Sequence, residues 1–196
     1  MNLINLQQKN RLFFTIEDLA KTLNIKEASA SVLASRYVKK GYFLGLKKNM
    51  YILKETASRA EKEALFRLSN VLQTPSYISL LTALSYYGVT TQMTREAVEA
   101  VNPVRSVEYE SGPLFFSFRK IQKKLYFGFS REQSFFIATP EKALLDALYL
   151  QSLGEYELDA SSLDLAKINK KSIEKIAKKF PFPTQKLLEK FLKNSS

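Results

Sequence analysis

The chain has 196 residues, of which 45% are hydrophobic and 12% aromatic, so one large domain or two small ones can bury a proper core. It contains no cysteine and no histidine, which excludes disulfides, thiolate metal sites, imidazole bases and serine triads of the usual kind. No apolar run is long enough to cross a membrane, and the N-terminus lacks the pattern of a secretion signal. We therefore expect a cytoplasmic protein without a membrane partner.

The formal net charge of +11 is concentrated at both ends of the chain. Residues 1–54 carry ten Lys or Arg and three Asp or Glu, and residues 165–196 carry nine and two, so each segment has a net charge of +7. The centre is left with −3. For the N-terminal segment a polyanionic partner is the natural explanation, because each neutralised phosphate releases counterions. The lysines of the C-terminal segment are more simply explained as the solvated face of amphipathic helices.

The first predicted elements are three helices. Residues 3–13 predict a helix packed beneath the next two. Thr15 can cap the second helix, whose apolar residues recur at helical spacing until Asn24 breaks the pattern. A third periodic run follows and ends at Gly41, a residue that readily takes positive φ.

A two-stranded hairpin is predicted directly after these helices. Residues 42–46 and 50–53 read as strands, and Lys47, Lys48 and Asn49 form the turn. Asn49 suits this place because asparagine tolerates the left-handed region that tight turns often need. The order of helix, turn, helix and basic hairpin predicts a winged helix-turn-helix over residues 1–54.

The last helix of this motif is expected to enter the major groove of DNA. Its periodicity places Ala30, Leu33, Ala34 and Tyr37 on the inner side and turns small polar side chains and cations outward. The predicted DNA-binding residues, including the lysines of the hairpin turn, are Ala28, Ser29, Ser31, Val32, Ser35, Arg36, Lys39, Lys47 and Lys48. The same elements also occur in domains that bind no nucleic acid, so the pattern alone leaves that alternative open.

The rest of the chain predicts an α+β domain over residues 74–196, reached through a linking helix within residues 55–73. Residues 58–72 have helical periodicity, and residues 77–87 are apolar nearly all round, which predicts a buried helix ended by Gly88. Turn signals separate short stretches rich in Val, Phe and Tyr, which predict an antiparallel sheet. The predicted strands are residues 98–101, 104–109, 114–121, 125–129 and 135–138.

Three helices are predicted after the sheet. Thr139 can cap the first, with Pro140 at its first position, and Lys142 and Asp146 are spaced to pair on its surface. Residues 170–180 and 183–192 predict two lysine-rich helices. The predicted fold class is therefore α+β, with a winged helix-turn-helix first and an antiparallel sheet and C-terminal helices after it.

Only carboxylates and lysines remain as candidate catalytic groups. The clusters are Glu155, Glu157 and Asp159, and Glu141, Lys142 and Asp146, which would have to bind Mg²⁺ in a nuclease. The first falls in an expected loop and the second is explained by the chemistry of a helix start. No glycine-rich phosphate loop is present. We expect no catalytic residue, no metal and no cofactor, and thus no enzyme.

Four stretches together resemble the AbiEi family, the antitoxins of bacterial abortive-infection type IV toxin–antitoxin systems. They are RYVKKGYFLGLKKNMYIL, PSYISLLTALSYYGV, FGF and IATPEKALLDALYL, and the similarity spans roughly residues 12–180. The segments Pro140 to Asp146 and Ala83 to Gly88 are its more specific parts. The chain departs from the family at Asn49, where the wing usually has glycine.

The resemblance implies a DNA-binding N-terminal domain that represses its own operon and a C-terminal domain that counters a nucleotidyltransferase-type toxin without needing a stable complex with it. Repressors of this architecture usually act on inverted repeats, so we expect two copies on operator DNA from a protein that is a monomer or weak dimer when free. The alternative is an interaction module that binds protein or RNA through its basic C-terminal helices and does not bind an operator.

Overall fold

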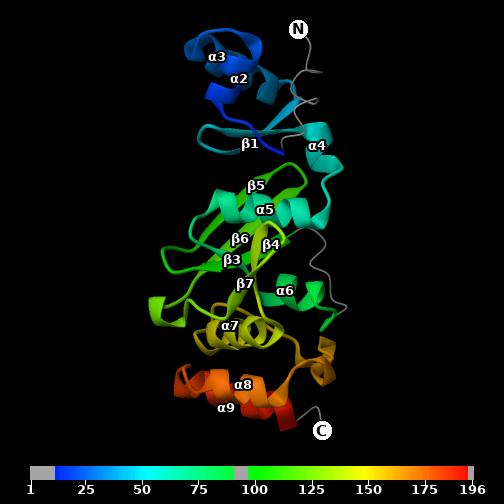
Figure 1. Ribbon diagram of the computed structural model, residues 1–196, viewed down its shortest axis with the longest axis vertical. Coiled ribbons are helices and arrows are strands. Elements are labelled where there is room, and N and C mark those ends of the chain that lie inside the picture. Colours follow the sequence, from blue (N-terminus) through cyan, green and yellow to red (C-terminus); the bar gives the residue numbers. More distant parts are fainter. Residues whose placement is uncertain (1–11, 91–96, 194–196) are drawn as a thin grey trace.

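The computed structural model describes residues 12–90 and 97–193, and within them the chain is an α+β protein. The molecule is elongated, with α2 (Ile16–Leu23) and α3 (Glu27–Lys39) at one end, α8 (Lys170–Ala177) and α9 (Phe182–Lys193) at the other, and a sheet between them (Figure 1). No helix in the described part is long and apolar enough to cross a membrane. The helix expected over residues 3–13 lies, except for its last two positions, outside the described residues.

The predicted N-terminal cap of α2 is confirmed, and the helix ends at Asn24, where the sequence pattern breaks. The Asp18 N–H donates to Thr15 Oγ1 at 3.2 Å, and the Thr15 N–H donates back to Asp18 Oδ2 at 3.0 Å. Asn24 ends the helix with a φ of 52°, in the left-handed region. α3 then packs on α2, with Ala30 and Ala34 completely buried between them.

The hairpin of β1 (Phe43–Lys47) and β2 (Met50–Leu53) is also confirmed, and Asn49 takes the expected positive φ, at 60°. The hairpin has two apolar faces. One lies in a small core under α2 and α3, through Phe43 and Leu53, and the other lies in the main core, through Leu46, Met50 and Ile52. It is therefore a layer between the first two helices and the rest of the molecule (Figure 1).

The helix predicted over residues 58–72 is confirmed from its fifth residue onward as α5 (Lys62–Leu72), and a separate short helix, α4 (Lys54–Ser58), precedes it and runs in a different direction (Figure 1). The chain turns between them so that Ala57 of α4 and Phe66 of α5 can both be buried in the main core. Because α5 also buries Leu68 and Leu72, the expected linking helix is part of that core.

The sheet is mixed, which corrects the expectation of an antiparallel one. Its order is β5-β6-β4-β3-β8-β7, and the β4–β6 and β3–β8 pairs are parallel. The strands are β3 (Tyr77–Ile78), β4 (Ala97–Asn102), β5 (Val107–Ser111), β6 (Leu114–Lys120), β7 (Phe129–Glu132) and β8 (Phe135–Ala138). The Asn102 side chain accepts from the N–H groups of Val104 and Arg105, forming a loop after β4. After this loop the chain passes to the edge of the sheet as β5 and returns as β6, which pairs with β5 on one side and with β4 on the other.

Two predicted elements have a different structure. Residues 77–87 begin with the two-residue strand β3, and the helix α6 (Leu80–Tyr86) starts only after Ser79. The strand predicted over residues 125–129 is replaced by the 3₁₀ turn η1 (Lys123–Leu125), and Gly128, with a φ of +73°, turns the chain into β7. In both places the apolar residues are buried in loops or helices, so the spacing of apolar residues in the sequence does not indicate whether the segment is a strand.

The helix α7 (Pro140–Ser152) is buried on nearly every side. Thr139 caps it as predicted, accepting from the Lys142 N–H at 3.3 Å. The sheet and α6 cover one side, and α8 and α9 cover the other (Figure 1). Two 3₁₀ turns, η2 (Ala160–Ser162) and η3 (Leu165–Lys167), lie between α7 and α8.

Candidate nucleic-acid interface

The outer face of α3 is open to solvent along its whole length. Its buried residues, Ala30 and Ala34, lie on the opposite side, as the sequence predicts. The predicted site residues on this helix are all exposed: Ala28, Ser29, Ser31, Val32, Ser35, Arg36 and Lys39. Arg36 and Lys39 form no ion pair with any of the described residues. The face therefore presents small side chains first and, at its C-terminal end, cations that pair with none of the described carboxylates.

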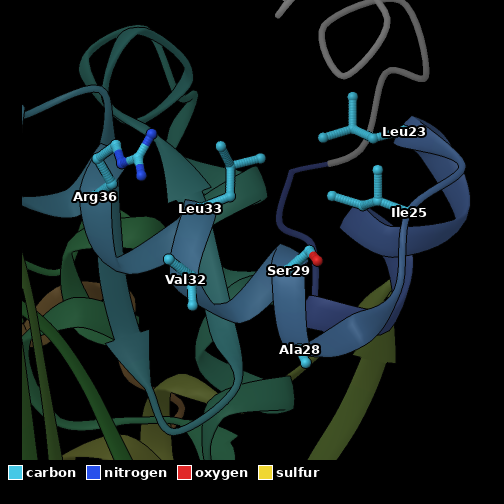
Figure 2. A pocket seen from close by; sticks show the side chains of 7 residues that line it. All are labelled: Leu23, Ile25, Ala28, Ser29, Val32, Leu33 and Arg36. Carbon is cyan, nitrogen blue, oxygen red and sulfur yellow. The ribbon is translucent and has the colours of Figure 1, made fainter.

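A hollow of about 660 Å³ lies along this face from Ala28 to Arg36. Figure 2 shows Ala28, Val32 and Arg36 following one another along α3, with Leu23, the last residue of α2, and Ile25 of the turn on the far side of the hollow. Its lining is mainly apolar, completed by Ser29 and Leu33. Val32 is the most exposed of its large apolar residues, at 62%.

A second hollow, of about 390 Å³, separates the last turns of α3 from the hairpin. Ser35, Val38 and Lys39 line it from α3, and Gly45, Lys47 and Tyr51 line it from the two strands. Its lining mixes hydroxyl and ammonium groups with apolar carbon, in contrast to the first hollow. The two hollows together border the exposed face of α3.

The two lysines predicted at the hairpin turn have different surroundings. Lys47 Nζ donates to the carbonyl oxygens of Leu72 at 2.9 Å and Val71 at 3.3 Å, at the C-terminal end of α5. This contact differs from the expected role in binding phosphate, because the cation already compensates the negative end of a helix dipole. Lys48 is exposed and has no such contact with the described residues. Of the two, Lys48 is therefore the better suited to a nucleic-acid interface.

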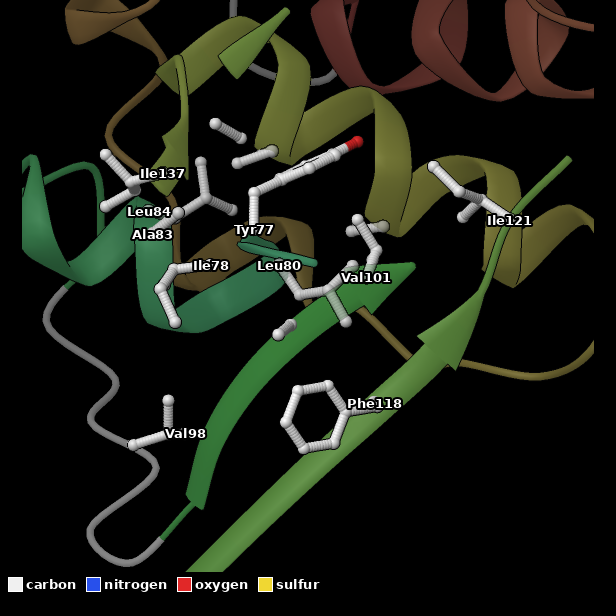
Figure 3. Packing of buried hydrophobic residues seen from close by; sticks show 14 of the residues in the cluster. Tyr77, Ile78, Leu80, Ala83, Leu84, Val98, Val101, Phe118, Ile121 and Ile137 are labelled. Carbon is white, nitrogen blue, oxygen red and sulfur yellow. The ribbon is translucent and has the colours of Figure 1, made fainter. Parts of the chain in front are cut away.

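The structure also contains a polar cluster that the sequence did not reveal, formed by Tyr77, Ser79, Lys142 and Asp146. Lys142 and Asp146 are bonded to each other and completely buried, so the expectation that they pair on the surface of α7 is wrong. Tyr77 OH accepts from Lys142 Nζ at 2.9 Å and donates to Asp146 Oδ2 at 3.0 Å. Ser79 Oγ donates to the same carboxylate oxygen at 2.9 Å. Figure 3 shows the Tyr77 hydroxyl pointing toward α7 from within the apolar core.

Aromatic rings enclose this cluster. Lys142 Nζ lies 5.2 Å from the ring centroid of Phe127 and 5.1 Å from that of Phe180, and Phe129 stacks on the Tyr77 ring at 4.4 Å. Gly128 lets the chain pass close, because a Cβ there would lie 3.0 Å from Lys142 Cγ. The stretches PSYIS, FGF and PEKALLD, which are far apart in the sequence, therefore meet at one buried point.

Burial acts on both charges of the pair. It lowers the pKa of Lys142 and raises the pKa of Asp146, and in each case the partner opposes the shift. Burial, reinforced by the Asp146 charge, also raises the pKa of Tyr77. Because all four side chains are closed off from solvent, the cluster serves the packing of α7 onto β3. The one signal in the sequence was that α7 is apolar on several faces, which predicts burial all round.

Other carboxylates are engaged in structural contacts. Glu99 is buried, accepts from Tyr156 OH at 2.9 Å and the Thr82 N–H at 3.2 Å, and its pKa is raised by burial. Glu141 accepts from the Asn169 N–H, and Asp159 accepts from Ser161. No group of three acidic side chains in the described residues is arranged to hold a metal ion.

Comparison with known proteins bears on the fold alone. No protein-family model matches the chain, and no curated protein matches it. The chain is similar to the crystal structure of the RV2827C protein from Mycobacterium tuberculosis, with a TM-score of 0.65 and 12% sequence identity. The likeness covers 99% of this chain and 75% of that one. At this level of identity, the two proteins share a fold and nothing further follows about function.

Proposed function

We propose that residues 12–53 act as a winged helix-turn-helix that binds operator DNA and that the protein is a transcriptional autorepressor. The observation that carries this proposal is the outer face of α3, which is exposed from Ala28 to Lys39 and lies within residues 1–54, a segment with a net charge of +7. A recognition helix must be free to enter the major groove, and this one is uncovered. Two copies would bind an inverted repeat, as is usual for repressors of this architecture.

We further propose that the chain is an AbiEi-type antitoxin, acting in the cytoplasm against a nucleotidyltransferase-type toxin and having no enzymatic activity of its own. Support for this part comes from the resemblance of the four sequence stretches, three of which meet at the Lys142 cluster. Co-expression with a nucleotidyltransferase encoded beside this gene tests it: the antitoxin should restore growth. Continued growth arrest with soluble, folded antitoxin would count against this part.

Operator binding is tested with three variants measured against operator and random duplexes over a range of salt concentrations. If Arg36 reads a base, Arg36→Ala should weaken operator binding by about 1–3 kcal/mol and leave random duplex nearly unaffected. Lys48→Ala should weaken both duplexes alike and flatten the salt dependence. Lys47→Ala is the matched control. Because the Lys47 ammonium group already contacts α5, this variant should weaken DNA binding less than Lys48→Ala does. Equal, salt-insensitive affinity of the unaltered protein for both duplexes would refute operator binding.

A second candidate function is an interaction module that uses the basic C-terminal helices. Eight lysines of residues 170–193 are exposed against two glutamates, and none of them forms an ion pair with a described residue. They are Lys170, Lys171, Lys175, Lys178, Lys179, Lys186, Lys190 and Lys193. Deleting these helices would uncover α7, so the suitable test is charge reversal at Lys186 and Lys190, which are not among the buried residues of α9. The module predicts loss of an RNA or protein ligand in this variant, whereas the repressor retains its operator.

A further inference from the structure

We propose that α3 selects thymine at the base pairs that face Ala28 and Val32, and that the ligand of the apolar hollow is the thymine methyl group. This inference rests on the proposed function, because it assigns a base preference to the proposed recognition helix. The juxtaposition that carries it is an apolar strip of exposed residues, Ala28 and Val32, followed one turn later by Arg36 (Figure 2). These three residues are four apart and so share one helix face.

An exposed valine is a poor choice for a face that only contacts phosphate. Its β-branched side chain lowers helix propensity, and at 62% exposure it gains little from burial in the free protein. Ile25, at 37% exposure, widens the apolar surface toward α2. The helix therefore carries apolar groups outward at positions where serine or lysine would suit both solvent and phosphate better.

Base edges offer one apolar group to such a surface. In the major groove, adenine, guanine and cytosine present hydrogen-bonding atoms, and only thymine adds a methyl group. Ala28, Ser31 and Ser35 are small, so the helix backbone can come close enough for the Val32 methyl groups to reach that depth. Positive charge at the C-terminal end of α3 makes a duplex the fitting occupant, because Arg36 and Lys39 lie there without acidic partners among the described residues, and the one acid of the helix, Glu27, is at its opposite end.

Arg36 predicts which base lies near this thymine in the preferred sequence. An exposed arginine pairs best with guanine, through O6 and N7. Val32 and Arg36 are one helical turn apart, a rise of about 6 Å, which corresponds to roughly two base pairs along the groove. The preferred half-site is therefore thymine followed within about two base pairs by guanine, on either strand.

The experiment begins with selection of duplexes from a random library by the full-length protein. In the best duplex each thymine is then replaced by deoxyuridine, which removes the methyl group and keeps every hydrogen-bonding atom. Affinity is measured by competition in fluorescence anisotropy. We expect one or two replacements per half-site to weaken binding by about fourfold each, and the others to have no effect.

Two variants assign the effect to the residue. In Val32→Ala the penalty for deoxyuridine should disappear at the thymine that faces residue 32, and the alanine should preserve the helix. Val104→Ala, at another exposed valine (53%), should keep the full penalty.

If no duplex is enriched, the proposed function fails and this inference with it. If a duplex is enriched but deoxyuridine costs nothing, or costs the same in Val32→Ala, only the thymine preference is overturned. A changed self-association of Val32→Ala with an unchanged penalty would overturn it too, by assigning the hollow to a second copy of the chain.

Discussion

The ammonium group of Lys142 is hydrogen-bonded to the carboxylate of Asp146, and neither side chain is exposed to solvent. Pairs at this spacing are common on helix surfaces, where they contribute little to stability. Here the same spacing lies in the core, and Tyr77 and Ser79 complete the hydrogen bonds of the carboxylate. Removing one charge would leave the other buried without its partner, so the pair specifies how α7 sits against β3.

This burial predicts strong coupling between the two residues in a double-mutant cycle. Lys142→Met and Asp146→Asn should each lower the free energy of unfolding by about 3–5 kcal/mol, because each leaves one buried charge. The double variant should lose less than the two single losses together, since no charge remains and the amide oxygen introduced at position 146 can still accept from Tyr77. Urea denaturation followed by circular dichroism measures all four proteins. The matched control is Lys21 with Glu17, an exposed pair at the same spacing, for which the two losses should be small and additive. Additive losses at the buried pair would contradict the prediction.

Replacing Gly128, which lies next to this cluster, with alanine is predicted to destabilise the protein more than the same substitution at Gly154. Its φ is +73°, and an added Cβ would lie 3.0 Å from Lys142 Cγ and 3.2 Å from Lys142 Cδ. Gly154 has nearly the same φ, +74°, but open space where a Cβ would stand. Gly154→Ala should therefore cost only the backbone strain, about 1–2 kcal/mol, and Gly128→Ala should cost clearly more. Thermal unfolding of both variants provides the comparison, and equal losses would show that the contact with Lys142 is unimportant.

The N-terminal elements could be predicted from the sequence because their signals are local. Thr15, Asn24 and Asn49 determine where helices and turns end through their own side chains and backbone preferences. The outward face of α3 followed from helical periodicity, so the exposure of its site residues was predictable. The contact of Lys47 with α5 was not, since residues 71 and 72 are brought to it by the tertiary fold.

The sheet order could not be predicted for the same reason. The sequence predicts only an antiparallel sheet, but β6 lies between β4 and β5, and the parallel pairing of Val98 with Phe116 joins strands that are not consecutive. Tyr77 and Ile78 form a strand too short to show alternation, next to a helix that is also apolar. The Lys142 cluster was hidden because a spacing of four residues says nothing about which elements will cover the helix.

Glu99 predicts a specific pH dependence of stability. Burial raises the pKa of its carboxyl above the ordinary value of 4.5, although hydrogen bonds from Tyr156 and Thr82 oppose the shift. The folded state therefore holds this proton more tightly than the unfolded state, and its stability should fall as the pH rises from 4.5 through the raised pKa. Glu99→Gln does not titrate. Urea denaturation of both proteins between about pH 4 and 8 should show unaltered protein losing stability relative to the variant as the pH rises.

Tyr156→Phe provides the second arm of that experiment. It removes a hydrogen bond that favours the charged carboxylate, so the pKa of Glu99 should rise further and the loss of stability should continue to higher pH. Stability curves that run parallel with pH in unaltered protein, Glu99→Gln and Tyr156→Phe would show that the buried carboxyl does not titrate differently in the folded state.

Asn49 combines two roles that substitutions can separate. Its φ of 60° lies in the left-handed region, and its Oδ1 accepts from the Ile16 N–H at 2.8 Å, a donor at the start of α2 that has no acceptor within the helix. Asn49→Asp should be nearly neutral, because aspartate tolerates this φ and its charge suits the N-terminal end of the helix. Asn49→Gly keeps the turn but loses the acceptor, at a cost of about 1 kcal/mol. Asn49→Ala should lose about 1–2 kcal/mol more through backbone strain.

Urea denaturation should rank the three Asn49 variants in that order. If glycine and alanine proved equal, the positive φ would contribute nothing and the bond to Ile16 would account for the whole effect. If glycine matched the unaltered protein, that bond would be dispensable and only tolerance of the positive φ would matter at this position.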